Sequence, residues 1–348
     1  MAAEVESLAS SVQELSMNRN GPPSRYLLKD GIGLNGDSSF PVLDIPVIDL
    51  GLLASSSPES EEQLDRLRSA LSYCGYFQAI NHGVESSFLD QVHDLTREFF
   101  QLPMEEKKKY SRDANGIDGY GNDVVYSEKQ TLDWNDRLYL NTLPIEIRKL
   151  EKWPKNPEKF SEMLCEYTTK LQGINEIILK GIAKSLNLEE NCFVKQFGKK
   201  PTTLARFNLY PPCPTPHLVL AAKAHGDASG TTFLLQDREV EGLQFLKDDQ
   251  WYRAPIIPDA IVFNVGDQLE IMTNGIYKSP IHRVVTNKER ERITAAFFFA
   301  PDPTSVVEPA EGLIDENRPR RYKKIVDYTA NYFEFFQKGM RPIDDLKI

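Results

Sequence analysis

Cysteine is scarce in this sequence, and its four cysteines stand far apart. Cys74, Cys165, Cys192 and Cys213 form no Cys-x-x-Cys pair. A chain of 348 residues is also long enough to build a core without disulfides. The sequence therefore predicts reduced, structural thiols, as is typical of proteins in a reducing compartment.

Long apolar runs and an excess of basic residues are lacking as well. No run is long enough to span a bilayer. The N-terminus carries Glu4 and Glu6 where a secretory signal would need positive charge. The formal net charge of −10 argues against a nucleic-acid surface, which requires clustered Lys and Arg. We expect a cytoplasmic protein without membrane or nucleic-acid partners.

Helical periodicity dominates the first part of the chain. Apolar residues that recur every three or four positions predict three helices, the last of them long. These cover residues 59–73, 86–101 and 160–186. Two short alternating stretches, residues 45–50 and 75–80, predict strands that have to join a later sheet, since their edges would otherwise be exposed.

After residue 200 the period changes from helical to alternating, which predicts many short strands. The predicted strands cover residues 204–210, 231–235, 243–246, 251–254, 260–265, 268–273, 282–286 and 292–300. Short strands at even spacing are typical of a sandwich or jelly roll. A C-terminal helix is predicted over residues 325–338. The expected fold class is therefore α+β.

Four regions follow from these patterns, and we expect them to form one compact domain. They are an N-terminal helix and extended arm (residues 1–40), a helical region whose strands join the core (41–200), the strand-rich core (201–302) and a C-terminal helix and tail (303–348). The glycine-punctuated segment 107–153 is either a lid or pocket wall or a surface loop.

His225 and Asp227 are two residues apart on a predicted strand or its end, so their side chains point to the same side. His282 begins a distant strand and can supply a third ligand. Two imidazoles and one carboxylate with open coordination positions suit iron(II). A lone His-x-Asp pair is more often structural. The other histidines lack partners at ligand spacing, and we expect His82 to be a turn hydrogen bonder, His93 a solvated helix residue and His217 a loop residue.

Arg292 and Thr294 are also two residues apart on one predicted strand. An Arg side chain grips a carboxylate with two parallel hydrogen bonds, and a neighbouring hydroxyl adds a third. Taken alone, Arg292 is better explained as a surface residue at a hairpin exit, because residues 288–292 form a charged run.

In this order and spacing, the motifs resemble those of plant iron(II)/2-oxoglutarate-dependent dioxygenases, in the isopenicillin N synthase-like superfamily. The resemblance rests on Asn208 to Cys213, His225-Gly226-Asp227, Asn274-Gly275, His282-Arg283 and Arg292-Ile293-Thr294. Further matches at residues 45–50 and 81–84 extend it over nearly the whole chain.

The resemblance implies a double-stranded β-helix, or jelly-roll, core flanked by helices. It implies iron bound by His225, Asp227 and His282. It also implies that Arg292 and Thr294 bind the distal carboxylate of 2-oxoglutarate, and that Tyr210 and Asn208 contact the co-substrate as well. Thr294 stands where the family has Ser, which keeps the hydroxyl and adds a methyl group. Dioxygen is the other co-substrate, and ascorbate supports activity in such enzymes.

By the same analogy, the substrate pocket is lined by Arg206, Arg137, Tyr126, Phe298 and Ala300. Flavonoid-oxidising relatives have an acidic residue at the position of Ala300. The absence of that acidic residue here weakens a flavonoid assignment.

The expected reaction is hydroxylation or O-demethylation of a small plant specialised metabolite (alkaloid, phenylpropanoid, flavonoid or terpenoid), giving succinate and CO2. Residues 130–134 resemble a branch that includes alkaloid O-demethylases. Halogenating members lack the carboxylate that Asp227 supplies. Two alternatives stay open: a non-catalytic, hormone-like binding protein on the same fold, and a relative that oxidises its substrate without 2-oxoglutarate. We expect a monomer.

Overall fold

The computed structural model describes residues 11–17, 21–32, 40–114, 116–122, 124–125, 130–330 and 332–348. Two β-sheets build the core of this part of the chain. The strands of the larger sheet are β1 (Val47–Asp49), β2 (Tyr76–Ile80), β3 (Gly119–Gly121), β4 (Asp136–Leu143), β5 (Thr202–Tyr210), β7 (Thr231–Leu235), β10 (Ile261–Val265) and β12 (Arg292–Ala300). Those of the smaller sheet are β6 (Leu220–His225), β8 (Leu243–Lys247), β9 (Gln250–Arg253) and β11 (His282–Val285).

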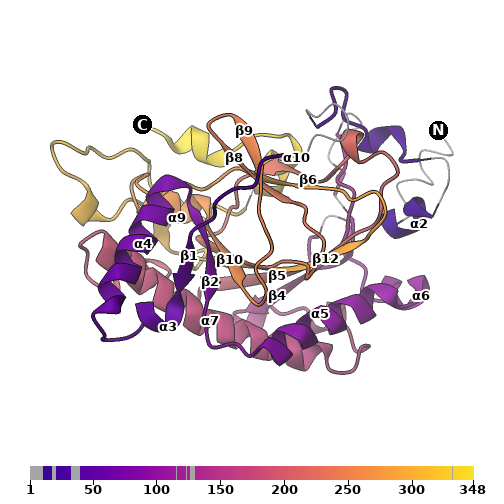
Figure 1. The fold of residues 1–348 in the computed structure, drawn as a ribbon, viewed down its shortest axis with the longest axis horizontal. Helices are drawn as coiled ribbons and strands as arrows, with labels where there is room; N and C mark the ends of the chain where they lie inside the picture. The colour runs from indigo at the N-terminus through magenta and orange to yellow at the C-terminus, as the bar shows by residue number, and fades with distance from the viewer. Residues whose placement is uncertain are drawn as a thin grey trace.

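The strand order places both halves of the chain in one sheet. The larger sheet runs β1-β2-β10-β7-β12-β5-β4-β3, and the smaller runs β6-β11-β8-β9. The two sheets face each other as a jelly roll, with β6 and β8 on one side and β10, β5 and β4 on the other (Figure 1). The expected α+β class with a jelly-roll core is confirmed.

The early strands join this sheet as predicted. Strand β1 pairs in parallel with β2, with Ile48 opposite Ala79, and β2 pairs antiparallel with β10, with Phe77 opposite Phe263. The Phe77 and Phe263 rings stack with centroids 4.7 Å apart. Pairing with β10 thus joins the two early strands to the larger sheet, where β1 forms one edge.

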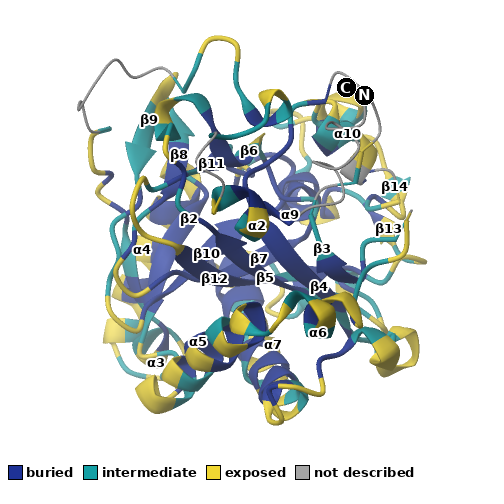
Figure 2. Ribbon diagram, turned by 90° about the vertical axis from the view of Figure 1, so that its right-hand side faces the viewer, coloured by how far each residue is buried: buried dark blue, intermediate teal, exposed yellow. Residues whose placement is uncertain are grey.

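Helices cover the outer face of the larger sheet. Those that chiefly contact its strands are α3 (Leu50–Leu53), α4 (Glu59–Tyr73), α5 (Ser86–Gln101) and α7 (Phe160–Ser185). The other α-helices of the described residues are α2 (Val12–Ser16), α6 (Met104–Lys108), α8 (Cys192–Gln196), α9 (Asp267–Met272) and α10 (Tyr332–Gln337). Figure 2 shows the strands above α5 and α7 buried and the outward sides of both helices exposed.

The long helix α7 packs along the sheet through its apolar stripe, as its period predicts. The Tyr167 ring meets Phe297 of β12 edge-on at 5.0 Å between centroids, and Phe160 meets Phe207 of β5 at the same distance. No helix in the described ranges is both long and apolar enough to cross a bilayer.

Two predicted elements are wrong. Residues 268–273 were expected to be a strand but lie in α9, whose six residues are all buried. A short segment buried on every side carries no period, so its type cannot be read from alternation. The helix expected over residues 325–338 is divided: Ile325–Val326 is strand β14, paired with β13 (Val306–Val307), and α10 starts only at Tyr332. Asp327, at φ +50°, breaks the helical path between them.

The other predicted helices and strands are confirmed, with ends shifted by at most two residues. Of the expected N-terminal helix and arm, residues 1–10, 18–20 and 33–39 lie outside the described residues, and α2 forms within the remainder.

Candidate metal and co-substrate site

Three side chains converge at the end of β6. His225 is the last residue of β6, Asp227 follows two residues later, and His282 opens β11 directly opposite His225 in the sheet. Asp227 Oδ1 lies 3.5 Å from His225 Nε2 and 3.6 Å from His282 Nε2. Within the described part of the chain, this is the one group of three or more His, Cys, Asp or Glu side chains whose ligand atoms all lie within 4.8 Å.

The remaining polar atoms of the three side chains are already engaged. The Nδ1 atoms of His225 and His282 lie 2.7 and 3.2 Å from the carbonyl oxygens of Lys223 and Pro280. A nitrogen facing a carbonyl has to be the donor, so a neutral ring keeps the lone pair on Nε2. The three inward atoms are therefore two imidazole nitrogens and one carboxylate oxygen free to bind a metal.

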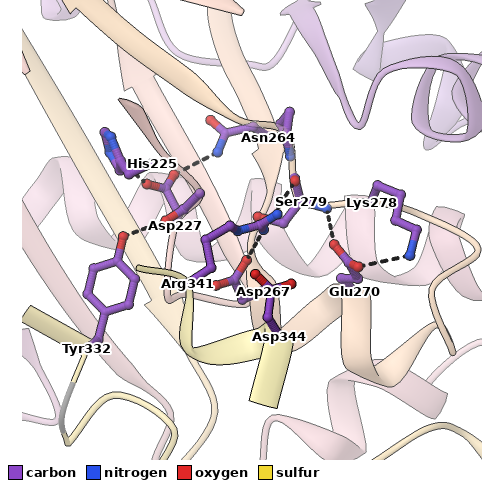
Figure 3. A network of polar contacts seen from close by, with 12 residues as sticks. His225, Asp227, Asn264, Asp267, Glu270, Lys278, Ser279, Tyr332, Arg341 and Asp344 are labelled. Atoms are coloured by element: carbon purple, nitrogen blue, oxygen red, sulfur yellow. Dashed lines mark hydrogen bonds and ion pairs between the residues drawn. The ribbon is translucent and has the colours of Figure 1, made fainter. Parts of the chain in front are cut away.

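Asp227 is held by two neighbours from the larger sheet. Its Oδ2 accepts hydrogen bonds of 2.7 Å from both Thr232 of β7 and Asn264 of β10, two residues that pair directly across the strands. Oδ1 is thereby left pointing at the imidazoles. Figure 3 shows the Asn264 amide reaching the Asp227 carboxylate.

The site favours the protonation state that metal binding needs. Burial, aided by the neighbouring His282, lowers the pKa of His225. Burial alone would raise the pKa of Asp227, but the two imidazoles and the bonds from Thr232 and Asn264 outweigh it, and the pKa is lowered. A neutral imidazole, which the lowered pKa of His225 favours, and an ionised carboxylate, which the lowered pKa of Asp227 favours, are forms that bind divalent cations.

A cavity of about 50 Å³ extends from these ligands to Arg292, and Asn208 and Tyr210 also line it. Arg292 is only 2% exposed. Its Nε donates to the Val240 carbonyl at 3.1 Å, whereas its buried Nη2 has no hydrogen-bond partner among the described residues. A buried guanidinium N–H without a partner is costly, and a carboxylate in this cavity would satisfy it.

Thr294 is fully buried and lies opposite Asn208 in the sheet. Its hydroxyl oxygen accepts a 3.0 Å hydrogen bond from Asn208 Nδ2, and Asn208 Oδ1 accepts one of 2.6 Å from Arg206 Nε. Thr294 itself is not among the described residues that line the small cavity, and it contacts Asn208, which is. These two hydrogen bonds connect Thr294 and Asn208 to Arg206, which also lines a second, larger cavity.

The larger cavity, of about 640 Å³, opens from His225 and Asp227. Arg206, Phe298 and Ala300 line it, as the sequence predicts. Among the described residues that line the cavity, Arg137 is absent. Its guanidinium carbon lies 4.2 Å from the centroid of the Tyr139 ring, and Tyr139 does line the cavity. Tyr126 lies outside the described residues.

Helix α10 covers the metal ligands from the outside. The Phe336 ring meets His225 edge-on at 5.0 Å between centroids. Lys223 Nζ lies 4.6 Å from the Phe336 ring centroid and bridges Asp133 and Gln337, at 3.0 Å each. Residues 130–134 and the C-terminal helix thus meet over the strand that carries His225.

Comparison with known proteins identifies the family to which this chain belongs. Residues 192–301 match the model of the 2OG-Fe(II) oxygenase superfamily, and residues 45–156 match that of the non-haem dioxygenase in morphine synthesis N-terminal region. Protein SRG1 of Arabidopsis thaliana is 37% identical over 98% of this chain and 97% of its own length. The chain belongs to the 2OG-Fe(II) oxygenase superfamily.

Other members of this superfamily are similar over most of their length. Codeine O-demethylase of Papaver somniferum is 39% identical, covering 90% of this chain and 88% of that protein. The crystal structure of JOX2 in complex with 2OG, Fe and JA superposes with a TM-score of 0.87 at 32% identity, covering 97% of this chain and 98% of that one.

The chain is therefore an Fe(II)/2-oxoglutarate-dependent dioxygenase. The residues present fit that cofactor and co-substrate: two imidazole nitrogens and one carboxylate oxygen for iron, and the unsatisfied Arg292 Nη2 for a carboxylate. When bound, iron and 2-oxoglutarate supply the oxidising chemistry with dioxygen, and the protein contributes position and charge.

The remaining histidines divide into two correct predictions and one wrong one. His82 lies at a turn with Nε2 2.8 Å from the Asp259 carbonyl, and His217 is exposed in a single 3-10 turn, Pro216–Leu218, within a connecting segment. His93 is wrong: it was expected to be solvated but is 6% exposed. The sequence analysis failed to reveal Thr232 and Asn264, whose only signal is a polar residue within an otherwise apolar strand. All four cysteines are free, as predicted.

Proposed function

We propose that His225, Asp227 and His282 bind iron(II), and that Arg292, Thr294, Tyr210 and Asn208 bind 2-oxoglutarate. The observation that carries this assignment is the pairing of two features: three ligand atoms left free by the hydrogen bonds around them, and the unsatisfied Arg292 Nη2 at the far end of the adjoining cavity.

The larger cavity supports a small, mainly apolar substrate with a polar end. Its walls combine aromatic rings with two cationic side chains, a composition typical of sites for drug-sized ligands. The residues that bear on this are Tyr139, Lys149, Arg206, Phe298, Ala300 and Phe336. Its volume of about 640 Å³ is within the range for such ligands.

We therefore propose hydroxylation or O-demethylation of a small plant specialised metabolite, with release of succinate and CO2. Names of relatives support this class: codeine O-demethylase and thebaine 6-O-demethylase of Papaver somniferum, and oxoglutarate-dependent flavonoid 7-O-demethylase 1 of Ocimum basilicum. In this chain, Phe298 and Arg206 would orient the substrate against the metal ligands, and Phe336 would exclude water.

A cytoplasmic monomer is also part of the proposal. The four free thiols are what a reducing compartment maintains. Gel filtration at micromolar concentration should give a mass near 39.6 kDa.

The test is a mass-spectrometric screen of plant metabolites with Fe(II), 2-oxoglutarate and O2. The expected products gain one oxygen or lose one methylene, with equivalent succinate release. His225→Ala and Asp227→Ala should abolish substrate-dependent succinate. Undiminished turnover in either variant would overturn the metal assignment, and tight binding of a metabolite without turnover would favour the binding-protein alternative.

Arg292→Gln tests the co-substrate assignment. Loss of a charge-assisted carboxylate grip should raise the KM for 2-oxoglutarate roughly tenfold to a hundredfold. Arg290→Gln is the matched control, because Arg290 is exposed and pairs with Glu239 on the surface. Equal KM values in the two variants would show that Arg292 does not bind 2-oxoglutarate.

A further inference from the structure

The C-terminal segment contacts the turn that joins two of the metal ligands. The hydroxyl of Tyr332, the first residue of α10, donates to the Gly226 carbonyl. Nine residues later, Arg341 Nη2 donates to Asp267 Oδ1 at 2.7 Å, and the Asp267 main-chain N–H donates to the Asp227 carbonyl, also at 2.7 Å. Figure 3 shows Tyr332 and Arg341 both reaching toward this turn.

Gly226 makes room for the Arg341 guanidinium. A Cβ at position 226 would lie 2.8 Å from Arg341 Nη2 and 2.9 Å from Ser279 Oγ, closer than real Cβ contacts allow. The guanidinium therefore occupies the space that a side chain between His225 and Asp227 would otherwise need. The turn and the C-terminal segment are complementary in shape at this point.

The ion pair below the turn is closely held and buried on its carboxylate side, while the Arg341 side chain is 26% exposed. Asp267 is 1% exposed, and its second oxygen accepts a 2.7 Å hydrogen bond from the Tyr328 hydroxyl. Glu270 and Asp344 add longer-range attraction for Arg341. Removing one partner of a buried pair leaves an uncompensated charge, which is strongly unfavourable. Here that charge would sit on the residue whose main chain is bonded to Asp227.

We propose that Arg341, together with Tyr332, positions the metal-binding turn, so that order in the C-terminal segment and metal binding depend on each other. This inference rests on the proposed iron site. Arg341 and Tyr332 are positioning residues in this role: they act on the metal through Asp267 and Gly226. By linkage, if the ordered C-terminal segment raises the affinity for metal, bound metal stabilises the ordered form of that segment by the same free energy.

The test is anaerobic titration of the metal-free, full-length protein with Co(II), followed by its visible absorption bands, with and without 2-oxoglutarate. Arg341→Gln and Tyr332→Phe should each weaken Co(II) binding roughly tenfold, the lower end of the effect of losing an outer partner of a metal ligand. Arg341→Lys, which keeps a positive charge against Asp267, should recover part of the affinity.

Arg320→Gln is the matched control. Arg320 also lies in the C-terminal segment and pairs with a carboxylate, Glu308, at 3.0 Å, but on the surface. Its Co(II) affinity should equal that of the unchanged protein. Hydrogen exchange supplies a second readout: Co(II) should slow exchange over residues 332–341 in the unchanged protein and much less in Arg341→Gln.

Co(II) affinities within twofold of the unchanged protein for both Arg341→Gln and Tyr332→Phe would overturn the inference. If Arg341→Gln does not fold, Tyr332→Phe decides in the same way, since it removes a single hydroxyl. Failure of the unchanged protein to bind Co(II) would instead sink the proposed iron site, so the two failures are distinguishable.

Discussion

His93 is a buried histidine on the sheet-facing side of α5, 6% exposed. Burial, with a smaller contribution from the nearby Arg238, lowers its pKa from 6.5 to about 4. Arg97 acts in the same direction, whereas Asp237 and Asp94 oppose it. The folded protein therefore holds this imidazole neutral at a pH where the unfolded chain would protonate it.

This shift predicts an acid-sensitive stability. Between pH 6.5 and 4 the unfolded state binds more protons at His93 than the folded state, so the free energy of unfolding falls as the pH falls through that window. The shift corresponds to about 3 kcal/mol of the free energy of unfolding. This contribution is fully present above pH 6.5 and is lost below pH 4. Urea unfolding of His93→Gln should show a flatter acid limb. The exposed His217→Gln should retain the original slope, and an unchanged slope in His93→Gln would contradict the prediction.

The proposed metal ligands, which the structure brings together, could be picked out from the sequence because their chemistry is concentrated in a His-x-Asp pair and one later histidine. Thr232 and Asn264 were not, because they lie on separate strands and meet Asp227 only through the pairing of β7 with β10. His93 was misjudged from its polarity. Its neighbours Leu89, Val92 and Thr96 are all buried, so the buried stripe of α5 is wider than its apolar residues alone indicate.

At the scale of elements, β12 divides three consecutive phenylalanines between two environments. Phe297 and Phe299 are buried, with Phe297 against Tyr167 of α7, whereas Phe298 lines the larger cavity. Alternation along a strand produces this division. Strand alternation could thus be predicted, but α9 could not, because all six of its residues are buried.

The division predicts opposite outcomes for neighbouring substitutions. Phe297→Ala should lower the free energy of unfolding by about 3 to 5 kcal/mol, since it leaves a cavity between β12 and α7. Phe298→Ala should change stability little and raise the KM for the metabolite found in the substrate screen. Denaturant unfolding and steady-state kinetics on both variants decide the point, and similar stability losses would show that Phe298 is a core residue.

At the scale of the whole molecule, strands from the first part of the chain flank strands from the second part at both ends of the larger sheet. β2 lies between β1 and β10, and β4 pairs with β5 on the other side of the same sheet. Separating residues 41–200 from 201–302 would strip β10 and β5 of hydrogen-bonded neighbours. We propose on this ground that the four regions fold as one cooperative unit.

One cooperative unit predicts one unfolding transition that responds as a whole to ligands. Far-ultraviolet circular dichroism, which follows helices such as α7, and near-ultraviolet circular dichroism, which follows aromatic packing, should give the same midpoint. Co(II) with 2-oxoglutarate, each at about a hundred times its Kd, should shift both signals together, because each ligand adds about 2.7 kcal/mol to the folded state. A transition that separates into two steps, or a ligand shift confined to the aromatic signal, would mean that the helical region and the jelly roll unfold independently, despite the sheet they share.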